Sequence, residues 1–274
     1  MDLGTGLTVL GTALGGKDII VKILGPTAEY IGDGLKDFAE KRVNNVKDIF
    51  KNANSKLGDK INSEGSIPPK VLRGTLNERS YASDFLSVDY FGGVLASSRS
   101  GISRDDRGVF FNALIARLST YQLRLHYVFY HSIKKSFNGE DINWGVDSER
   151  SKMKLYIPYS SFIQAMDFDK NELNNLSIYL DHVINGLLRE QLVDNFFQYG
   201  NVEHIKKHFA DAEESGIILQ PNRLGFELFY WAYGMGQEST KTFLDEEKVF
   251  ELDEKIKLDD RIRKITGVNN GYSK

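Results

Sequence analysis

Apolar residues recur every three or four positions over most of the first 140 residues. This spacing places apolar side chains on one face of a helix, so the pattern predicts a helical N-terminal half. Proline is tolerated in the first turn of a helix, so a helix is expected to begin at Pro68 and Pro69. The predicted helices cover residues 27–57, 68–76, 83–98 and 103–137, the last with Ser103 as its N-cap.

Two adjacent glycines interrupt the third of these helices. Gly92 and Gly93 each cost about 1 kcal/mol against alanine inside a helix. We therefore expect another backbone to pack closely there, with Phe111 or Leu114 of the next helix filling the space.

The pattern changes after a polar loop at residues 138–151. Residues 153–157 alternate between apolar and polar side chains, which is the period of a strand. Asp169 and Glu172 have the spacing of a capping box and predict the start of an amphipathic helix. The remaining elements are a helix at 159–166, the capped helix to about 188, strands at 192–197 and 216–219, and a helix at 223–233.

These elements predict a mostly α protein with an N-terminal helical domain followed by a small α+β domain. The order helix, strand, long turn, strand, helix between Leu187 and Gly234 is typical of a winged-helix-like module. The charged tail has one apolar edge, which predicts a docked segment or a helix that frays near Asn269. The predicted parts are a leader at 1–24, the helical domain at 25–140, the winged-helix-like domain at 141–236 and the tail at 237–274.

The leader is apolar and rich in glycine between residues 3 and 24, but Lys17 and Asp18 interrupt it. Its uncharged part is about 14 residues long, and a helix that spans a bilayer needs about 20. Met1 and Asp2 do not form the basic start of a signal peptide. A buried or mobile leader and a segment that contacts a membrane through residues 3–24 both remain open.

Composition excludes several kinds of site. The 274 residues carry a net charge of −3 and contain no cysteine. The chain has no global positive field that would attract nucleic acid. Disulfides, thiolate zinc sites and a cysteine nucleophile are excluded, and a reducing cytoplasm is the expected location.

The motifs give no support for an enzyme. Residues 11–17 match the phosphate-loop pattern GxxxxGK, but Asp18 stands where a serine or threonine would reach Mg²⁺. Motifs of serine hydrolases, zinc proteases and kinases are absent from the sequence. We therefore expect neither catalytic residues nor a cofactor.

The polar stretch between the two predicted strands, residues 198–215, holds the candidate site residues. His204 and His208 are four positions apart on a predicted short helix, a spacing that can bind a metal, although no third ligand is evident. The solvated edge of a helix is the alternative. The interaction candidates of this stretch are Tyr199, His204, Lys206, Lys207 and His208.

The capped helix offers a second kind of contact, because asparagine can read adenine edges in DNA. It carries Lys170 at its start and Arg189 at its end, together with Glu172 and Asp181, so its attraction to phosphate is small. The polar residues of this helix are Asn171, Asn174, Asn175, Ser177 and Asn185. A DNA-binding transcriptional regulator is therefore the alternative function.

Two passages together resemble the Abi-alpha (abortive infection alpha) family of bacteria. The first passage comprises residues 68–72 and 84–96, and the second comprises 187–193, 216–221 and 224–229. The chain departs from the family pattern at Gly92 and Gly93, where a Trp-Ala-type pair is more typical, and in the length of residues 198–215. The resemblance implies a bacterial cytosolic protein of phage defence and brings no catalytic residues.

The leading hypothesis is therefore a non-enzymatic phage-defence protein that acts through protein contacts. Its partner would be a phage-derived trigger or a second copy of the chain. The membrane-active leader belongs to this hypothesis as an addition.

Overall fold

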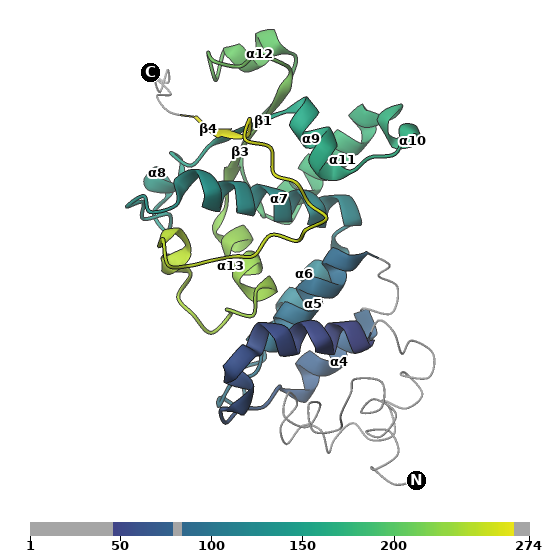
Figure 1. Ribbon diagram of the computed structural model, residues 1–274, viewed down its shortest axis with the longest axis vertical. Helices are drawn as coiled ribbons and strands as arrows, with labels where there is room; N and C mark the ends of the chain where they lie inside the picture. The colour runs from purple at the N-terminus through teal and green to yellow at the C-terminus, as the bar shows by residue number, and fades with distance from the viewer. Residues whose placement is uncertain (1–45, 79–83, 266–274) are drawn as a thin grey trace. The chain divides into compact units, whose positions relative to one another are not determined.

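The computed structural model describes residues 46–78 and 84–265 (Figure 1). The predicted leader, the first part of the predicted helix at 27–57 and the predicted fraying at Asn269 lie outside these residues. The expected mostly α fold with a small sheet is confirmed. None of the helices in the described ranges is long and apolar enough to cross a membrane.

The chain forms two compact units. The first comprises Met1–Thr120 and Leu228–Ser239, and the second comprises Tyr121–Glu227 and Thr240–Lys274. The boundaries of these units differ from the predicted domain boundaries at 140 and 236. That the predicted domains fold independently stays a prediction.

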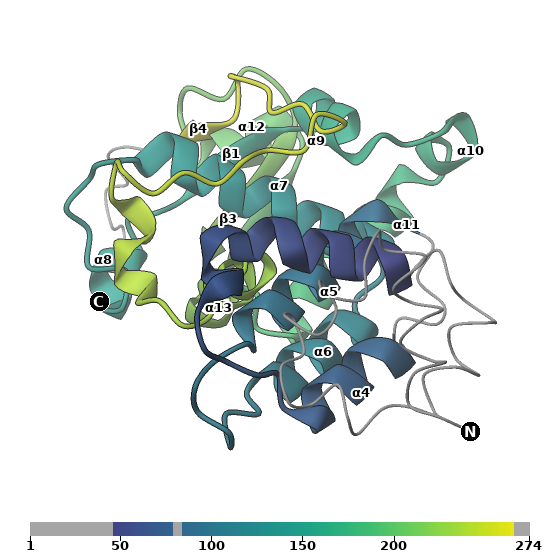
Figure 2. The same ribbon diagram turned by 60° about the horizontal axis from the view of Figure 1, so that its bottom comes forward.

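The first unit is helical. Residues 46–57 form a helix that η2 (Gly58–Asn62) continues, and the proline-led helix appears as α4 (Pro69–Glu78). The unit also contains α5 (Phe85–Ser97) and α6 (Gly108–Arg117). Helices α4, α5 and α6 pack against one another (Figure 2).

The glycine pair of α5 allows two close approaches of backbone. A Cβ added at Gly92 would lie 3.1 Å from the Ile49 carbonyl oxygen, and one at Gly93 would lie 1.8 Å from the Ala232 carbonyl oxygen. The expected backbone approach is confirmed, and the nearest atoms belong to Ile49, Asn52, Ala53 and Ala232 and not to Phe111 or Leu114. Phe111 instead stacks on Trp231 with ring centroids 4.5 Å apart.

The predicted helix at 103–137 is wrong in its continuity and in its N-cap. The structure has two helices, α6 and α7 (Thr120–Phe137), and the first begins at Gly108, five residues after Ser103. Leu118 is extended, with φ −81° and ψ 134°. Ser119 and Thr120 follow, and such residues favour helix starts because their hydroxyls compete for backbone N–H groups.

The second unit is built around α7 and a four-stranded antiparallel sheet of order β2-β3-β1-β4. The chain passes through α8 (Asp147–Arg150) to β1 (Leu155–Pro158) and α9 (Tyr159–Met166). The elements after α9 are α10 (Lys170–Leu173), α11 (Leu176–Arg189), β2 (Val193–Gly200), α12 (Val202–Lys206), β3 (Gly216–Pro221), α13 (Arg223–Ala232), η4 (Thr240–Leu244) and β4 (Arg263–Lys264).

The capping box is confirmed: the Asp169 side chain accepts hydrogen bonds from the backbone N–H groups of Asn171 and Glu172. The helix that it starts is shorter than predicted, because α10 ends at Leu173 and α11 begins at Leu176. The division of α13 between the two units falls after Glu227.

The predicted strand before Pro158 is confirmed, although it begins at Leu155 and not at Met153. All four residues of β1 are buried, and β1 lies between β3 and β4 in the sheet. Leu155 pairs with Leu219, and Tyr156 pairs with Ile218.

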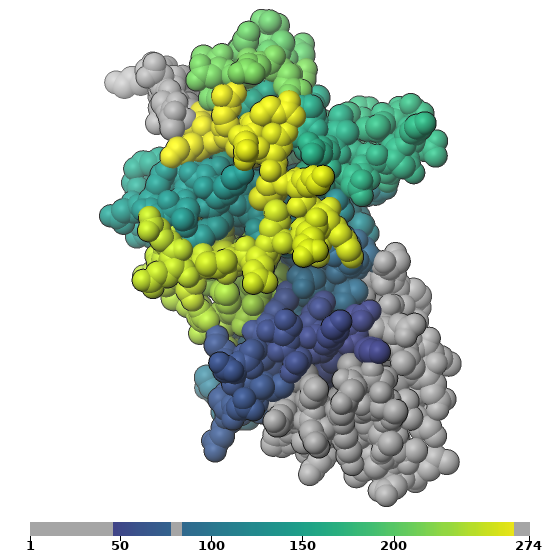
Figure 3. All heavy atoms as spheres, viewed as in Figure 1, coloured from purple at the N-terminus to yellow at the C-terminus, as the bar shows by residue number. Residues whose placement is uncertain are grey.

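The tail of the second unit is a docked segment with little helix. Figure 3 shows residues 240–265, coloured yellow-green to yellow, running over the surface of this unit. Its strand β4 pairs with β1, and the Ile265 N–H donates to the Lys154 carbonyl oxygen at 2.9 Å.

Candidate interaction surface

The polar stretch predicted at 198–215 is a folded projection of the sheet. Its first three residues belong to β2, where Gln198 pairs with Ile218 and Gly200 pairs with Gly216. The excursion proper is therefore 201–215. The Asn201 side chain caps α12 by accepting a hydrogen bond from the His204 N–H at 2.9 Å.

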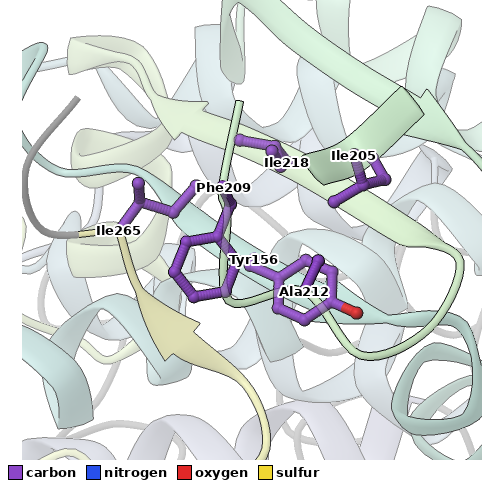
Figure 4. Packing of buried hydrophobic residues seen from close by; sticks show 6 residues of the cluster. All are labelled: Tyr156, Ile205, Phe209, Ala212, Ile218 and Ile265. Carbon is purple, nitrogen blue, oxygen red and sulfur yellow. The ribbon is translucent and has the colours of Figure 1, made fainter. Parts of the chain in front are cut away.

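The inner face of the excursion has a hydrophobic core of its own. Ile205, Phe209 and Ala212 pack on Tyr156 of β1 and Ile218 of β3. Ile205 is fully buried, and the rings of Phe209 and Tyr156 lie 5.2 Å apart. Burying each large side chain stabilises by about 2 kcal/mol, so the excursion is held in one conformation. Figure 4 shows the cluster, which comprises Tyr156, Ile205, Phe209, Ala212, Ile218 and Ile265.

The outer face of the excursion carries the candidate cations. Lys206 and Lys207 are exposed, and His204 and His208 are half-buried. The two imidazole rings lie 5.4 Å apart, so the structure brings the predicted pair together. Neither lysine forms an ion pair with a described residue.

The donor atoms around the histidine pair are insufficient for a structural zinc site, which has four ligands. His204 Nε2 lies 2.9 Å from Gln198 Oε1 and takes part in that hydrogen bond. In the part of the chain that the structure describes, no group of three His, Cys, Asp or Glu residues could hold a metal ion. The outer face thus presents imidazole and ammonium groups without a carboxylate ligand between them.

Lys154 and Phe196 join this face from the sheet. The Lys154 Nζ lies 4.0 Å from the centroid of the Phe196 ring, and the His208 ring lies 6.4 Å from the same ring. Burial lowers the pKa of His208, and the positive groups of His204, Lys207 and Lys154 lower it further. We call these groups the cationic cluster: Lys154, His204, Lys207 and His208 lie near one another beside Phe196, and the exposed Lys206 is added to them as the base that precedes Lys207 in the chain.

Sequence reasoning missed Lys154 and Phe196, because each reads as an ordinary residue of a strand. Lys154 lies just before β1 and Phe196 lies in β2, and only the sheet places them together. The alternation of side chains along β2 could have shown that Phe196 faces the same side as Gln198.

Tyr199 faces the opposite side of β2. Its hydroxyl donates to the Asp181 carboxylate of α11 at 2.6 Å, and this hydrogen bond raises the pKa of Tyr199. Its ring stacks on Phe197 at 6.1 Å. The structure therefore separates Tyr199 from the other four candidates and gives it the role of joining β2 to α11.

The polar residues predicted on the capped helix are exposed along α10 and α11. Two apolar side chains, Leu173 and Ile178, are exposed among them. The acids Glu172 and Asp181 are held by the hydroxyls of Tyr121 and Tyr199. The exposed polar residues are Asn171, Asn174, Asn175, Ser177 and Asn185.

An open hollow of about 720 Å³ lies beside the tail in the second unit. The nearby hydroxyls of Ser160 and Ser161 donate to the carboxylates of Glu214 and Asp259. Arg261 binds both carboxylates and lowers the pKa of Asp259, so these charges are already compensated. The hollow is lined by Lys135, Gln164, Leu252, Ile256, Lys257, Leu258, Asp259, Asp260 and Arg261.

Comparison with known proteins gives no relative on which to rest a function: no protein-family model, curated protein or solved structure matches this chain.

Proposed function

We propose that this chain is a non-enzymatic protein of bacterial phage defence that acts through protein contacts made by its excursion, residues 201–215. Its resemblance to the Abi-alpha family motivates the biological setting. The observation that carries the mode of action is the excursion itself, a projection with a buried inner core and an exposed outer face.

A rigid projection suits recognition because little conformational entropy is lost when it binds. The Asn201 cap and the burial of Ile205 and Phe209 fix α12 before any partner arrives. The exposed lysines of α12 and the following turn are then presented in a fixed arrangement.

The winged-helix-like assignment belongs to the same proposal. It is supported by the chain order α7, β1, α9, α11, β2, β3 and by the neighbouring antiparallel strands β2, β3 and β1. In such a module the hairpin β2–β3 is the wing, and here the excursion extends it.

A second candidate function, a DNA-binding transcriptional regulator, is favoured by the exposed amides of α10 and α11. Against it, the described charges on α11 are one acid, Asp181, and one base, Arg189. Phosphate contacts supply most of the affinity for DNA, so this helix face offers little of it. The duplex DNA in the binding experiment below tests this candidate.

The membrane-active leader lies outside the described residues and stays a prediction. In the proposal, the leader acts on a membrane after a partner has bound. The proposed role of the excursion does not depend on the leader.

A bulky substitution on the excursion tests the proposed function. Lys206→Trp adds a large ring to the exposed side of α12 and should block contact whatever the charge of the partner. We expect protection against phage, measured as plating efficiency on bacteria that express the chain, to fall at least about tenfold, as for loss of a contact worth about 1.4 kcal/mol.

Lys47→Trp is the matched control, because Lys47 is also an exposed helical lysine. It should protect as the wild type does, with equal protein abundance by immunoblot. The proposed function is rejected if the wild type protects against no phage in a broad panel. It is also rejected if Lys206→Trp and Lys47→Trp protect equally well.

A further inference from the structure

The fold sorts the charges of the excursion onto two sides. In the sequence, Glu203 precedes the bases at 204–208, and Asp211, Glu213 and Glu214 follow them. In the structure, Glu213 and Glu214 face the tail, where Arg263 and Arg261 lie 3.6 and 3.2 Å from their carboxylates. The tail therefore neutralises two acids of the excursion.

The bases remain together on the other side. Lys206 and Lys207 form no ion pair with described residues, and Lys207 and Lys154 both lie near His208. Like charges repel, so their proximity raises the energy of the free protein. A negative ligand would remove this repulsion and gain attraction.

An aromatic ring lies at the centre of the cluster. Phe196 is half-buried, with Lys154 over its face and His208 at its edge. A peptide segment supplies carboxylates for the lysines and apolar side chains for the ring. Duplex DNA presents mainly phosphates along its backbone, and much of its affinity for proteins comes from many phosphate contacts, which the few bases of this cluster do not provide.

We propose that the cationic cluster around Phe196 binds an acidic segment of a partner protein. This inference rests on the proposed function, since it names the chemistry of the partner that the excursion would recognise. Two acids oppose such a ligand: the exposed Glu203, which precedes His204 in the chain, and Asp194, whose carboxylate acts on the Lys154 ammonium.

Fluorescence anisotropy of the full-length protein with a labelled hexaglutamate peptide tests the inference. At about 50 mM NaCl, where screening is moderate, the peptide should bind the wild type. The double variant Lys206→Glu, Lys207→Glu should bind at least about tenfold more weakly, because it reverses two contacting charges. Glu203→Gln should bind more tightly than the wild type.

The double variant Lys47→Glu, Lys51→Glu is the control, since it makes the same change in net charge at two exposed lysines of the first unit. Its affinity should stay within about twofold of the wild type. No binding by the wild type, or an equal loss in both double variants, overturns the inference. The inference is also overturned if the wild type binds a duplex DNA of equal charge more tightly than the peptide and the double variant Lys206→Glu, Lys207→Glu loses this DNA binding. That result favours the DNA-binding candidate.

The two proposals can fail separately. In one case the peptide binds in a way that depends on Lys206 and Lys207, but Lys206→Trp protects against phage as well as the wild type does. This result supports the acidic ligand site and rejects the proposed function. In the other case Lys206→Trp loses protection, but the wild type does not bind the peptide. This result supports a protein contact at the excursion and rejects the inference that the partner segment is acidic.

Discussion

At the scale of single residues, glycine and tyrosine decide how closely the elements approach. Gly93 lets the carbonyl group of Ala232 rest on α5, and Gly225 leaves room for the Tyr130 hydroxyl. That hydroxyl donates to the Leu192 carbonyl oxygen at 2.7 Å and accepts from the Asn222 N–H at 3.1 Å. The end of β3 and the approach to β2 are thereby tied to α7.

Gly93→Ala should destabilise the protein strongly, because its methyl group would lie 1.8 Å from backbone that cannot rotate away. We expect a loss of about 3 kcal/mol or more in the free energy of unfolding, measured from urea denaturation. Gly101→Ala is the control, since a Cβ there meets no atom within 4 Å. A Gly93→Ala protein as stable as Gly101→Ala would show that α5 does not pack on Ala232.

At the scale of elements, capping residues set where the short helices begin. Asn201 starts α12 and Asp169 starts α10, each through a side-chain oxygen that accepts backbone N–H groups. Neither helix is long enough to be stable alone, because nucleation costs more than a few helical hydrogen bonds return. The cap and the packing of one buried face therefore hold α12 in place.

Asn201→Ala should loosen the excursion without unfolding the sheet. Loss of the cap costs about 1 kcal/mol, so the His204 amide should exchange with solvent about five times faster. Hydrogen exchange followed by mass spectrometry or NMR measures this. Asp169→Ala should speed exchange at Glu172 and leave His204 unchanged; faster exchange at His204 in both variants would mean that α12 does not depend on its own cap.

At the scale of the whole molecule, a net charge of −3 conceals a local arrangement of opposite sign. The tail arginines face the acids at 213 and 214, while the cluster around Phe196 keeps its bases. The global charge excludes long-range attraction to polyanions. It does not exclude a local site for a short acidic segment, because only charges within about a Debye length act on such a ligand.

Global stability should decrease as the pH falls from neutral toward 4. Burial lowers the pKa of His126 to about 3, while its Nε2 stays hydrogen-bonded to the Gly225 carbonyl oxygen. The unfolded chain takes up this proton near pH 6.5 and the folded chain does not, so stability present above pH 6.5 is lost progressively below it. His126 alone contributes up to about 1.4 kcal/mol per pH unit in this window.

Urea denaturation at pH 7 and pH 5 measures this dependence. The variant His126→Gln keeps a hydrogen-bond donor for the Gly225 carbonyl but does not titrate, so its stability should depend less on pH. Parallel curves for the variant and the wild type would mean that His126 is not buried in its neutral form.

The sequence by itself determined most elements, because their signals are local. The capping box of Asp169, the proline-led α4, and the strands and helices from Leu155 to Ala232, apart from the division between α10 and α11, follow from the periods of apolar residues and from the chemistry of helix starts. The sequence also placed His204, Lys206, Lys207 and His208 on one stretch. It did not show the break at Leu118, because the apolar pattern continues across it.

Only the tertiary structure decided which charges remain available. Pairing of β1 with β3 and of β3 with β2 brings Lys154 to Phe196, across 42 positions of the chain. Docking of the tail gives Glu213 and Glu214 their arginines, while Lys206 and Lys207 form no ion pair within the part of the chain that the structure describes. Strand pairing and tail docking depend on burial of side chains distant in sequence, such as Tyr156, Ile218 and Ile265, which no local pattern specifies.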